Sequence, residues 1–475
     1  MGEELLPSGQ CYPVAVTAPA ASSLASLHAY VDAHAEEFLE ELCDFVRQPS
    51  QTGLLDQVRA GAEYTRALAE RSGWQAEVVD VGELAPLVVA ERPGPPGSKT
   101  LLLYSHYDVI SPEPVAEWTY PPFGATRVDG RIFGRGATDA KANVLSFLKA
   151  GQSFGATAGQ PPLGLKLILE GEEERGSGNL HEFMDRHAGR LQADAALSFD
   201  GGIDASGVPK IGLGTSGMLY VELLATGARK ELHSAQARLY VNPAFRLVWA
   251  LASIKGPDER VLIDGFYDGI QPPSDEDRRL MAAMPWNDQR QLDEAGLESF
   301  LTGVRGQAAI ERLLFQPGLA ICGMISGFTG DGPKAVIPNR ASCKLEFRIV
   351  PDQTPERTLE LLRAHLDKHG FGDIRVNVIS VVETAKTEPD AAIVRAVIAA
   401  ARDLFDGREP MLKPTEEYAG LQGAWLGRRL GIPGVQTGVG PPGFRGHAVD
   451  EFVTDEAFIR GIKYAAGIFD HFARA

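Results

Sequence analysis

The chain has 475 residues, enough for two or three domains rather than a single core. Its 46 Lys and Arg residues against 63 Asp and Glu residues give a formal net charge of −17. This charge argues against an extended surface for nucleic acid or anionic membrane. The sequence contains four cysteines but no CxxC pair, and it has no apolar run of transmembrane length. Its first residues are acidic, unlike a signal peptide. We therefore expect a cytoplasmic protein that binds neither nucleic acid nor membrane.

Extended and helical patterns alternate along the chain, after an aperiodic arm at residues 1–23. The hydrophobic spacing predicts helices at 26–46, 61–72, 143–150, 358–368 and 389–404, and strands at 75–81, 87–91, 101–104, 163–169, 193–199, 219–224 and 344–350. Asp129-Gly130 is typical of a hairpin turn. Residues 258–316 are charged and lack periodicity, which predicts an irregular excursion on a dimer-facing or substrate-facing side. This succession of elements predicts an α/β protein.

The strand at 101–104 runs directly into His106 and Asp108. Side chains two residues apart on extended backbone point to the same side. An imidazole next to a carboxylate is a common arrangement for a metal ligand held in one tautomer. Taken alone, the pair is better explained as a hydrogen-bonded histidine at a strand end, and the rest of the chain reverses that preference.

Carboxylates also follow other predicted strands of the same half of the chain. Glu170, Glu173 and Glu174 come after the strand at 163–169, and Asp200 comes after the strand at 193–199. Asp139 follows two glycines and precedes a predicted helix, which it would also suit as an N-cap. Because clustered carboxylates repel one another unless a cation neutralises them, the pattern favours a metal site over a solvated surface.

Four motifs in order resemble the M20 metallopeptidases, in particular their carnosinase-like and cytosolic dipeptidase branch. They are Ser-His-Tyr-Asp-Val from residue 105, Gly-Arg-Gly-Ala-Thr-Asp from 134, Glu-Gly-Glu-Glu-Glu-Arg-Gly-Ser from 170 and Ser-Phe-Asp from 198. The resemblance extends from about residue 26 to the C-terminus. It implies a catalytic domain with a mixed, mainly parallel sheet flanked by helices, interrupted by a smaller α+β lid that forms a homodimer. We expect the catalytic domain at 1–213 and 385–475 and the lid at 214–384.

The resemblance also implies a site with two divalent metal ions, most simply Zn²⁺, with Mn²⁺ or Co²⁺ as alternatives. Asp139 would bridge the two metals, and Glu173 would be the general base. Spacing alone does not decide between Glu173 and Glu174 as ligand; the family's register assigns Glu174. Asp108 would be the partner of His106. The implied ligand set is His106, Asp139, Glu174, Asp200 and His447.

Three residues of the lid complete the implied site. Arg348 and Asn339 would contact the substrate, and His233, in Leu-His-Ser, would reach the active site of the opposite subunit and donate a hydrogen bond to the oxyanion. On spacing alone, His233 is explained as an exposed or capping lid histidine, and Arg348 as an ordinary strand arginine.

The sequence departs from the family's usual pattern at three places. Ala140 follows Asp139 where many members have a second aspartate, and Asp450-Glu451 replaces asparagine-glutamate. Tyr418-Ala419-Gly420 stands where many members have a Gly-Gly-Ser/Thr loop that holds the substrate's carboxyl end. These differences leave open a substrate other than a standard dipeptide.

Three functions are therefore considered. The first is a dinuclear zinc peptidase acting on a dipeptide or aminoacyl amide. The second is an amidohydrolase that removes an acyl group from an amino acid or specialised metabolite. The third is a binding dimer without metal.

Overall fold

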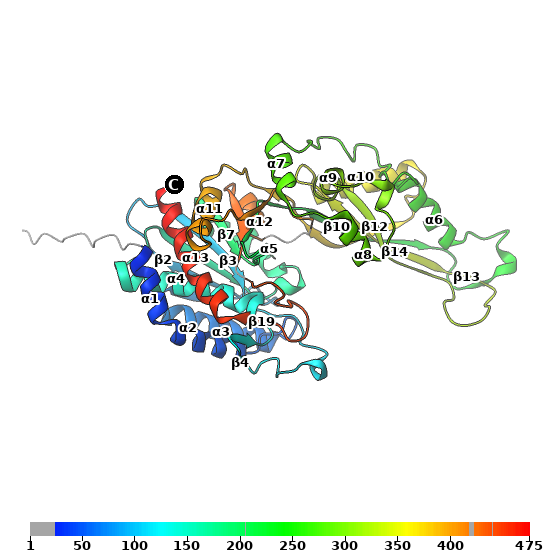
Figure 1. Cartoon of the computed structure of the whole chain (residues 1–475). Coiled ribbons are helices and arrows are strands. Elements are labelled where there is room, and N and C mark those ends of the chain that lie inside the picture. Colours follow the sequence, from blue (N-terminus) through cyan, green and yellow to red (C-terminus); the bar gives the residue numbers. More distant parts are fainter. Residues whose placement is uncertain (1–23, 205, 418–421, 439) are drawn as a thin grey trace, which may run out of the picture.

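Two β-sheets organise the molecule, one in each of two units that lie side by side (Figure 1). The computed structural model describes residues 24–204, 206–417, 422–438 and 440–475. The larger unit holds a mixed eight-stranded sheet in the order β1-β2-β6-β3-β7-β18-β8-β17. Its strands are β1 (Gln75–Val79), β2 (Leu87–Arg92), β3 (Thr100–His106), β6 (Gly164–Glu170), β7 (Ala195–Phe199), β8 (Lys210–Gly212), β17 (Met411–Lys413) and β18 (Gly434–Thr437).

The central strands are parallel and are covered on both faces by helices. Along β3, Leu101 and Leu103 belong to one hydrophobic core, while Leu102 and Tyr104 belong to the core on the opposite face. This burial explains why the strand is a continuous apolar run rather than an alternating one. The helices of this unit are α1 (Leu24–Ala33), α2 (Ala35–Arg47), α3 (Leu55–Arg71), α4 (Asn143–Ala158), α5 (Gly178–His187), α11 (Ala392–Leu404), α12 (Gln422–Leu430) and α13 (Asp455–Arg474).

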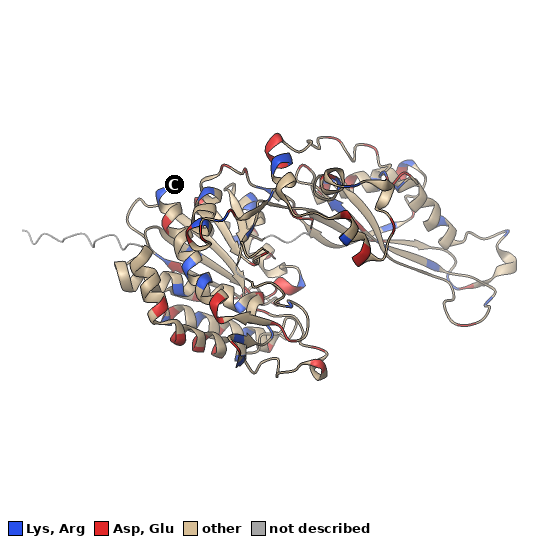
Figure 2. Ribbon diagram, in the orientation of Figure 1, with Lys and Arg blue, Asp and Glu red and all other residues tan. Residues whose placement is uncertain are grey.

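A small three-stranded sheet borders the larger unit, in the order β19-β5-β4. Asp129-Gly130 forms the turn between β4 (Thr126–Val128) and β5 (Arg131–Phe133), as predicted, and β19 (Phe452–Thr454) pairs with β5. Figure 2 shows acidic positions along α2 and α3 of the larger unit and charges of both signs on the two units.

The smaller unit has a four-stranded antiparallel sheet in the order β12-β14-β10-β15. Along β10, residues alternate between buried and partly exposed, and Leu219, Val221 and Leu223 form a core with α6 and α10. The elements of this unit are β10 (Gly217–Thr226), β11 (Leu232–His233), β12 (Gly318–Ser326), β13 (Val336–Ile337), β14 (Arg340–Ile349), β15 (Arg375–Val382), α6 (Pro243–Ile254), α7 (Asp275–Ala283), α8 (Asp288–Ala295), α9 (Gln307–Phe315) and α10 (Pro355–Lys368). The predicted α/β fold with a second α+β unit is confirmed.

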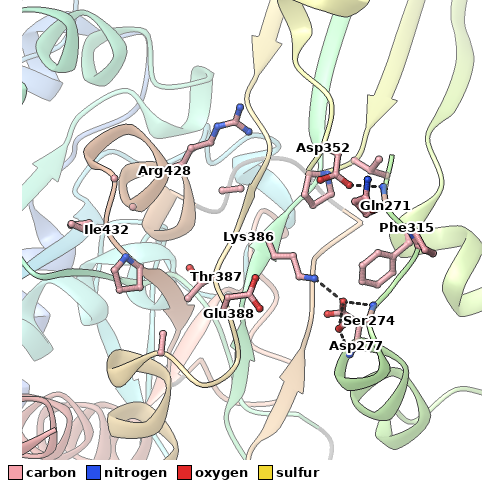
Figure 3. A pocket seen from close by; sticks show the side chains of 18 residues that line it. Gln271, Ser274, Asp277, Phe315, Asp352, Lys386, Thr387, Glu388, Arg428 and Ile432 are labelled. Atoms are coloured by element: carbon pink, nitrogen blue, oxygen red, sulfur yellow. Dashed lines mark hydrogen bonds and ion pairs between the residues drawn. The ribbon is translucent and has the colours of Figure 1, made fainter. Parts of the chain in front are cut away.

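The chain passes between the two units through a pair of short antiparallel strands, β9 (Gly214–Thr215) and β16 (Ala385–Lys386). The two strands lie at residues 214 and 385, where the sequence predicts the boundaries between the catalytic domain and the lid. The division into these two domains stays a prediction. A cavity of about 740 Å³ lies beside the two strands (Figure 3). In its wall, Lys386 Nζ lies 2.7 Å from a carboxylate oxygen of Asp277, which is buried at the start of α7 and also accepts hydrogen bonds from Ser274.

Two predictions of local structure are wrong. The helix predicted at 26–46 is divided at His34. The Tyr30 carbonyl oxygen accepts a hydrogen bond from the backbone N–H of His34 and also lies 2.9 Å from the side-chain Nδ1 of His34. The excursion at 258–316 is not irregular, because it contains α7, α8 and α9. Leu280 of α7 packs into the core of the larger unit, so its apolar surface is buried by tertiary contact that local periodicity does not reveal. Among the described residues, no helix has the length and apolar character needed to cross a membrane.

Candidate metal centre

The candidate metal ligands lie at the carboxyl ends of neighbouring parallel strands. His106 is the last residue of β3, Asp200 follows β7, and Glu173 and Glu174 follow β6 in a short 3₁₀ turn. Because β6, β3 and β7 are adjacent and parallel, their carboxyl ends meet at one edge of the sheet. Asp139 comes from the segment before α4, and His447 from the loop between β18 and β19.

Asp139 lies between the two histidines. Its Oδ1 is 3.1 Å from His106 Nε2, and its Oδ2 is 3.2 Å from His447 Nε2. Asp200 Oδ1 lies 3.9 Å from the same nitrogen of His106, and Glu174 Oε2 lies 3.1 Å from His447 Nε2. The structure thus brings all five candidate ligands together in two groups, His106–Asp139–Asp200 and Asp139–Glu174–His447, that share Asp139.

The donor set fits divalent metal ions. Asp139 presents one carboxylate oxygen to each histidine, as a bridging ligand would. Within the described residues, the buried atoms His106 Nε2 and Glu174 Oε1 form no hydrogen bond, as expected of atoms whose partner is a bound metal ion. Imidazole nitrogens and carboxylate oxygens in this combination are ligands of zinc and similar metals.

Asp108 connects the end of β3 to the turn that carries the two glutamates. Its backbone carbonyl oxygen lies 3.0 Å from His106 Nδ1, and its carboxylate oxygen Oδ1 lies 3.4 Å from the same nitrogen. The carboxylate also accepts hydrogen bonds from the backbone N–H groups of Glu173 and Glu174. One buried side chain therefore orients both the imidazole and the acidic turn.

The electrostatics of the cluster reflect burial and close contact. Hydrogen bonds with Asp139 and Glu174 raise the pKa of His447 to about 10. Burial raises the pKa of Asp200 to about 6, against the opposing effect of its contact with His106. Burial would also raise the pKa of Asp139, but its contacts with His106 and His447 outweigh it and lower that pKa. The carboxylates thus depend on positive charge at the two imidazole positions, which metal ions also supply.

Glu173 is partly buried and lies beside this cluster. Burial raises the pKa of its carboxyl well above the usual value, and the charges of Asp200, Glu170 and Glu174 add to that effect. Glu173 could also contribute an oxygen to a group with His106 and Glu174, but it does not belong to the group that contains His447. A carboxyl with a raised pKa next to a metal site is suited to accept and return a proton.

A cavity of about 700 Å³ opens on the cluster. Among its lining residues are Asp139, Glu173, Asp200 and His447, as expected from the sequence. The sequence analysis missed other residues of its wall: Thr138, Asn143, Ile203, Asp204, Lys210, Met411 and Phe444. They come from segments far apart in the chain, and none of the four motifs contains them except for Thr138, which directly precedes Asp139.

The interpretation of Asp139 as an N-cap is wrong. The residue before α4 is Ala142, and the helix has no side-chain cap. Asp139 instead has a non-helical backbone, with φ of −110° and ψ of 88°, inside the turn at Ala137–Ala142. This conformation directs its carboxylate to the two histidines.

The three lid residues lie apart from this cavity within one chain. His233 is exposed, and its Nδ1 accepts a hydrogen bond from the backbone N–H of Ala235. It pairs with β13, at the end of the smaller unit remote from the larger one (Figure 1). Arg348 forms an ion pair with Glu346, and Asn339 lines a separate cavity of the smaller unit. The Tyr418-Ala419-Gly420 loop lies outside the described residues.

Comparison with known proteins identifies the class of this chain. The profile of peptidase family M20/M25/M40 matches residues 102–471. The chain belongs to this family and is a metallopeptidase, an enzyme that hydrolyses peptide bonds with the help of divalent metal ions. The sequence-based resemblance is therefore confirmed, and a binding dimer without metal is not supported.

Relatives and solved structures agree with this assignment. The chain is 27% identical over 368 residues to the human Beta-Ala-His dipeptidase, covering 74% of this chain and 72% of that protein. It is 26% identical over 365 residues to the Cys-Gly metallodipeptidase DUG1 of Saccharomyces cerevisiae, covering 73% and 76%. The structure of the M20 family metallo-carboxypeptidase Sso-CP2 from Sulfolobus solfataricus is similar with a TM-score of 0.82 and 31% identity, covering 92% of this chain and 100% of that chain. Human carnosine dipeptidase 1 is similar with a TM-score of 0.74 and 25% identity, covering 96% and 100%.

Proposed function

We propose that this enzyme cleaves the peptide or amide bond of a small substrate such as a dipeptide or aminoacyl amide, with two divalent metal ions per chain. One observation carries the proposal: Asp139 faces His106 with one carboxylate oxygen and His447 with the other. His106, Asp139 and Asp200 would hold one metal, and Asp139, Glu174 and His447 the other. Zn²⁺ is the first choice for this donor set, and Mn²⁺ or Co²⁺ are alternatives.

Metal ions in such a site polarise the substrate carbonyl and lower the pKa of water. Glu173 would act as the general base, taking a proton from water and returning it to the leaving amine. Its raised pKa and its place in the cavity wall support this role. Asp108 would keep His106 and the Glu173–Glu174 turn in position through the contacts of its buried carboxylate.

Dipeptides are the proposed substrate class because two similar proteins are named for the dipeptides that they hydrolyse, Beta-Ala-His and Cys-Gly. The cavity of about 700 Å³ has room for a molecule of this size. An amidohydrolase acting on an N-acyl amino acid would use the same metal site, and it differs only in the groups that hold the two ends of the substrate.

The proposed assembly is a homodimer through the smaller unit. Large apolar side chains are exposed on α6 and on the edge strand β12, including Phe245, Trp249, Ile321 and Ile325. Exposed apolar surface of this kind is typical of an interface. In such a dimer His233 would serve the partner's active site, and Arg348 and Asn339 would contact the substrate. A cytoplasmic location stays a prediction from the sequence.

An activity screen tests the proposed function. The protein is loaded with Zn²⁺, Mn²⁺ or Co²⁺ and assayed against dipeptides, N-acyl amino acids and β-alanyl amides, with a chelated sample as control. We expect hydrolysis of dipeptides or aminoacyl amides that disappears on chelation and returns with metal. Preferred hydrolysis of N-acyl amino acids would establish the deacylase instead, and full activity of the metal-free protein would contradict the mechanism.

A further inference from the structure

Lys210 lies in the wall of the metal cavity, at the start of β8 and soon after the proposed metal ligand Asp200 in the chain. Two backbone hydrogen bonds hold the residues on either side of position 205 together: the N–H of Asp204 donates to the Val208 carbonyl at 2.8 Å, and the N–H of Lys210 donates to the Gly202 carbonyl at 3.1 Å. On the other side, Thr437 Oγ1 donates to the Lys210 carbonyl at 2.9 Å. The backbone of Lys210 is therefore held in a definite place relative to Asp200.

The ammonium group of Lys210 has no partner among the described residues. Lys210 is exposed and lines the same cavity as Asp139, Glu173 and Asp200, and no hydrogen bond or ion pair of its Nζ is found within the described ranges. The other acids near it are engaged. Asp204 accepts hydrogen bonds from its own turn, at Ser206 and Val208.

Glu416 is a further acid near Lys210, whose positive charge lowers the pKa of the Glu416 carboxyl against the larger raising effect of burial. Its carboxylate is already paired with the ammonium of Lys413, and it is mostly buried. The positive charge of Lys210 is thus left facing the cavity. Of the acids in the cavity wall, Asp139 and Asp200 would bind metal ions, and Glu173 would act as the general base. None of the three would then be a partner for the ammonium group of Lys210.

The surroundings of Lys210 show what this charge could bind. Ile203, Met411 and Phe444 line the same cavity and give its wall an apolar part. A cation beside apolar side chains is complementary to a ligand group in which a short hydrocarbon chain carries a terminal carboxylate. On a peptide, this carboxylate is either an acidic side chain or the C-terminus.

We propose that Lys210 is a specificity-determining residue, whose ammonium group binds a carboxylate of the substrate. This inference rests on the proposed function, since it assumes that the substrate is bound in the metal cavity. The enzyme would then favour substrates with a carboxylate within reach of Lys210 over matched substrates in which an amide replaces it.

Matched substrate pairs test this inference and distinguish the two sources of the carboxylate. The pairs are Glu-Ala with Gln-Ala, Ala-Glu with Ala-Gln, and Ala-Gln with its C-terminal amide. For each pair, the ratio of kcat/KM for the acid to kcat/KM for the amide is measured in wild type and in Lys210→Met. We expect at least one ratio to fall by about fivefold, the upper end for a solvent-exposed ion pair.

Two further variants sharpen the result. Lys210→Arg keeps the charge and should keep most of the preference. Lys368→Met removes an exposed lysine of α10 in the smaller unit, changes the net charge by the same amount and should leave every ratio unchanged. The pair whose ratio falls identifies the carboxylate that Lys210 binds. Ratios that are equal in wild type and Lys210→Met for all three pairs would overturn the inference.

A binding measurement separates this inference from the proposed function. Calorimetry on the metal-loaded wild type and Lys210→Met compares glutarate, whose two carboxylates can bind the metal site and Lys210 together, with butyrate, whose single carboxylate would bind the metal site. If Lys210 binds a carboxylate, the variant loses about fivefold in affinity for glutarate and less for butyrate. This result would support the inference even if no peptide were cleaved. Equal losses, or none, would overturn it even if peptides were cleaved.

Discussion

The carboxylate of Glu451 accepts a hydrogen bond of 3.1 Å from the backbone N–H of Asp139, across 312 residues of sequence. It also accepts from the N–H groups of Gly136 and Thr138 and from Arg135 at 2.7 Å. Glu451 is fully buried and lies four residues after His447. The C-terminal loop therefore carries both a proposed metal ligand and the side chain that holds the proposed bridging carboxylate.

Replacing Glu451 with Gln should weaken both the fold and the metal site. The amide would present N–H groups where backbone donors and the buried Arg135 need an acceptor, and breaking such a buried pair typically costs about 3 kcal/mol or more. We expect a loss of this size in the free energy of unfolding in urea and a lower metal content by mass spectrometry. Asp450→Asn is the matched control, because the partners found for Asp450 in the described part of the chain are the exposed Thr119, through its backbone N–H and hydroxyl, and Arg445 at 3.8 Å. Equal effects of the two substitutions would contradict this role.

Glu170 predicts a pH dependence of stability. It is buried at the end of β6, accepts a hydrogen bond from Tyr104 at 2.6 Å, and has a pKa raised to about 8 chiefly by burial. Between its unfolded pKa, about 4.5, and about 8, the unfolded chain binds fewer protons at this group, so its ionisation lowers stability as pH rises. The amide side chain of the Glu170→Gln variant does not titrate, so this contribution to the pH dependence of stability is absent from the variant.

We therefore expect the stability of Glu170→Gln relative to wild type to increase between pH 5 and pH 8, by on the order of a few kcal/mol. Urea unfolding in excess chelator at each pH measures this difference without a contribution from metal affinity. A difference that stays constant over this range would show that Glu170 is ionised in the folded protein.

Mixing two inactive variants tests the proposed role of His233. If it donates a hydrogen bond to the oxyanion in the partner's site, His233→Ala should lose roughly 10²–10³-fold in turnover. Combined with Glu173→Gln, some heterodimers would have one site with both groups intact. With free subunit exchange about half of the dimers are mixed and one of their two sites is repaired, so activity should approach roughly a quarter of wild type. No recovery despite demonstrated exchange would place His233 outside the partner's site.

The sequence predicts the strands and the side chains at their ends well, because apolar runs and the residues that follow them are local features. His106, Asp200 and Glu174 could be singled out in this way, and the structure brings them together at one sheet edge. Glu451 could not, because its contact with Arg135 joins residues 316 positions apart. Lys210 was also missed, since an exposed lysine in a three-residue strand has no distinctive pattern.

The helices α7 to α9 were missed for a related reason. Their sequence is rich in charged residues, and α7 is stabilised by contacts outside its own segment, through Leu280 and the pair of Asp277 with Lys386. The domain boundaries and the roles of the site residues stay predictions, since position alone does not establish them.

The most direct test of the account compares Glu173→Gln with Glu174→Gln, two neighbouring substitutions of equal size and charge. Metal content and dipeptide turnover are measured on both. We predict that Glu173→Gln keeps about two metal ions per chain while turnover falls by roughly 10²–10⁴-fold, as expected for a lost general base. Glu174→Gln should lose metal, because its carboxylate belongs to the group with Asp139 and His447. Loss of metal from Glu173→Gln and retention by Glu174→Gln would contradict this assignment of the two residues, and full turnover of both would contradict the proposed mechanism.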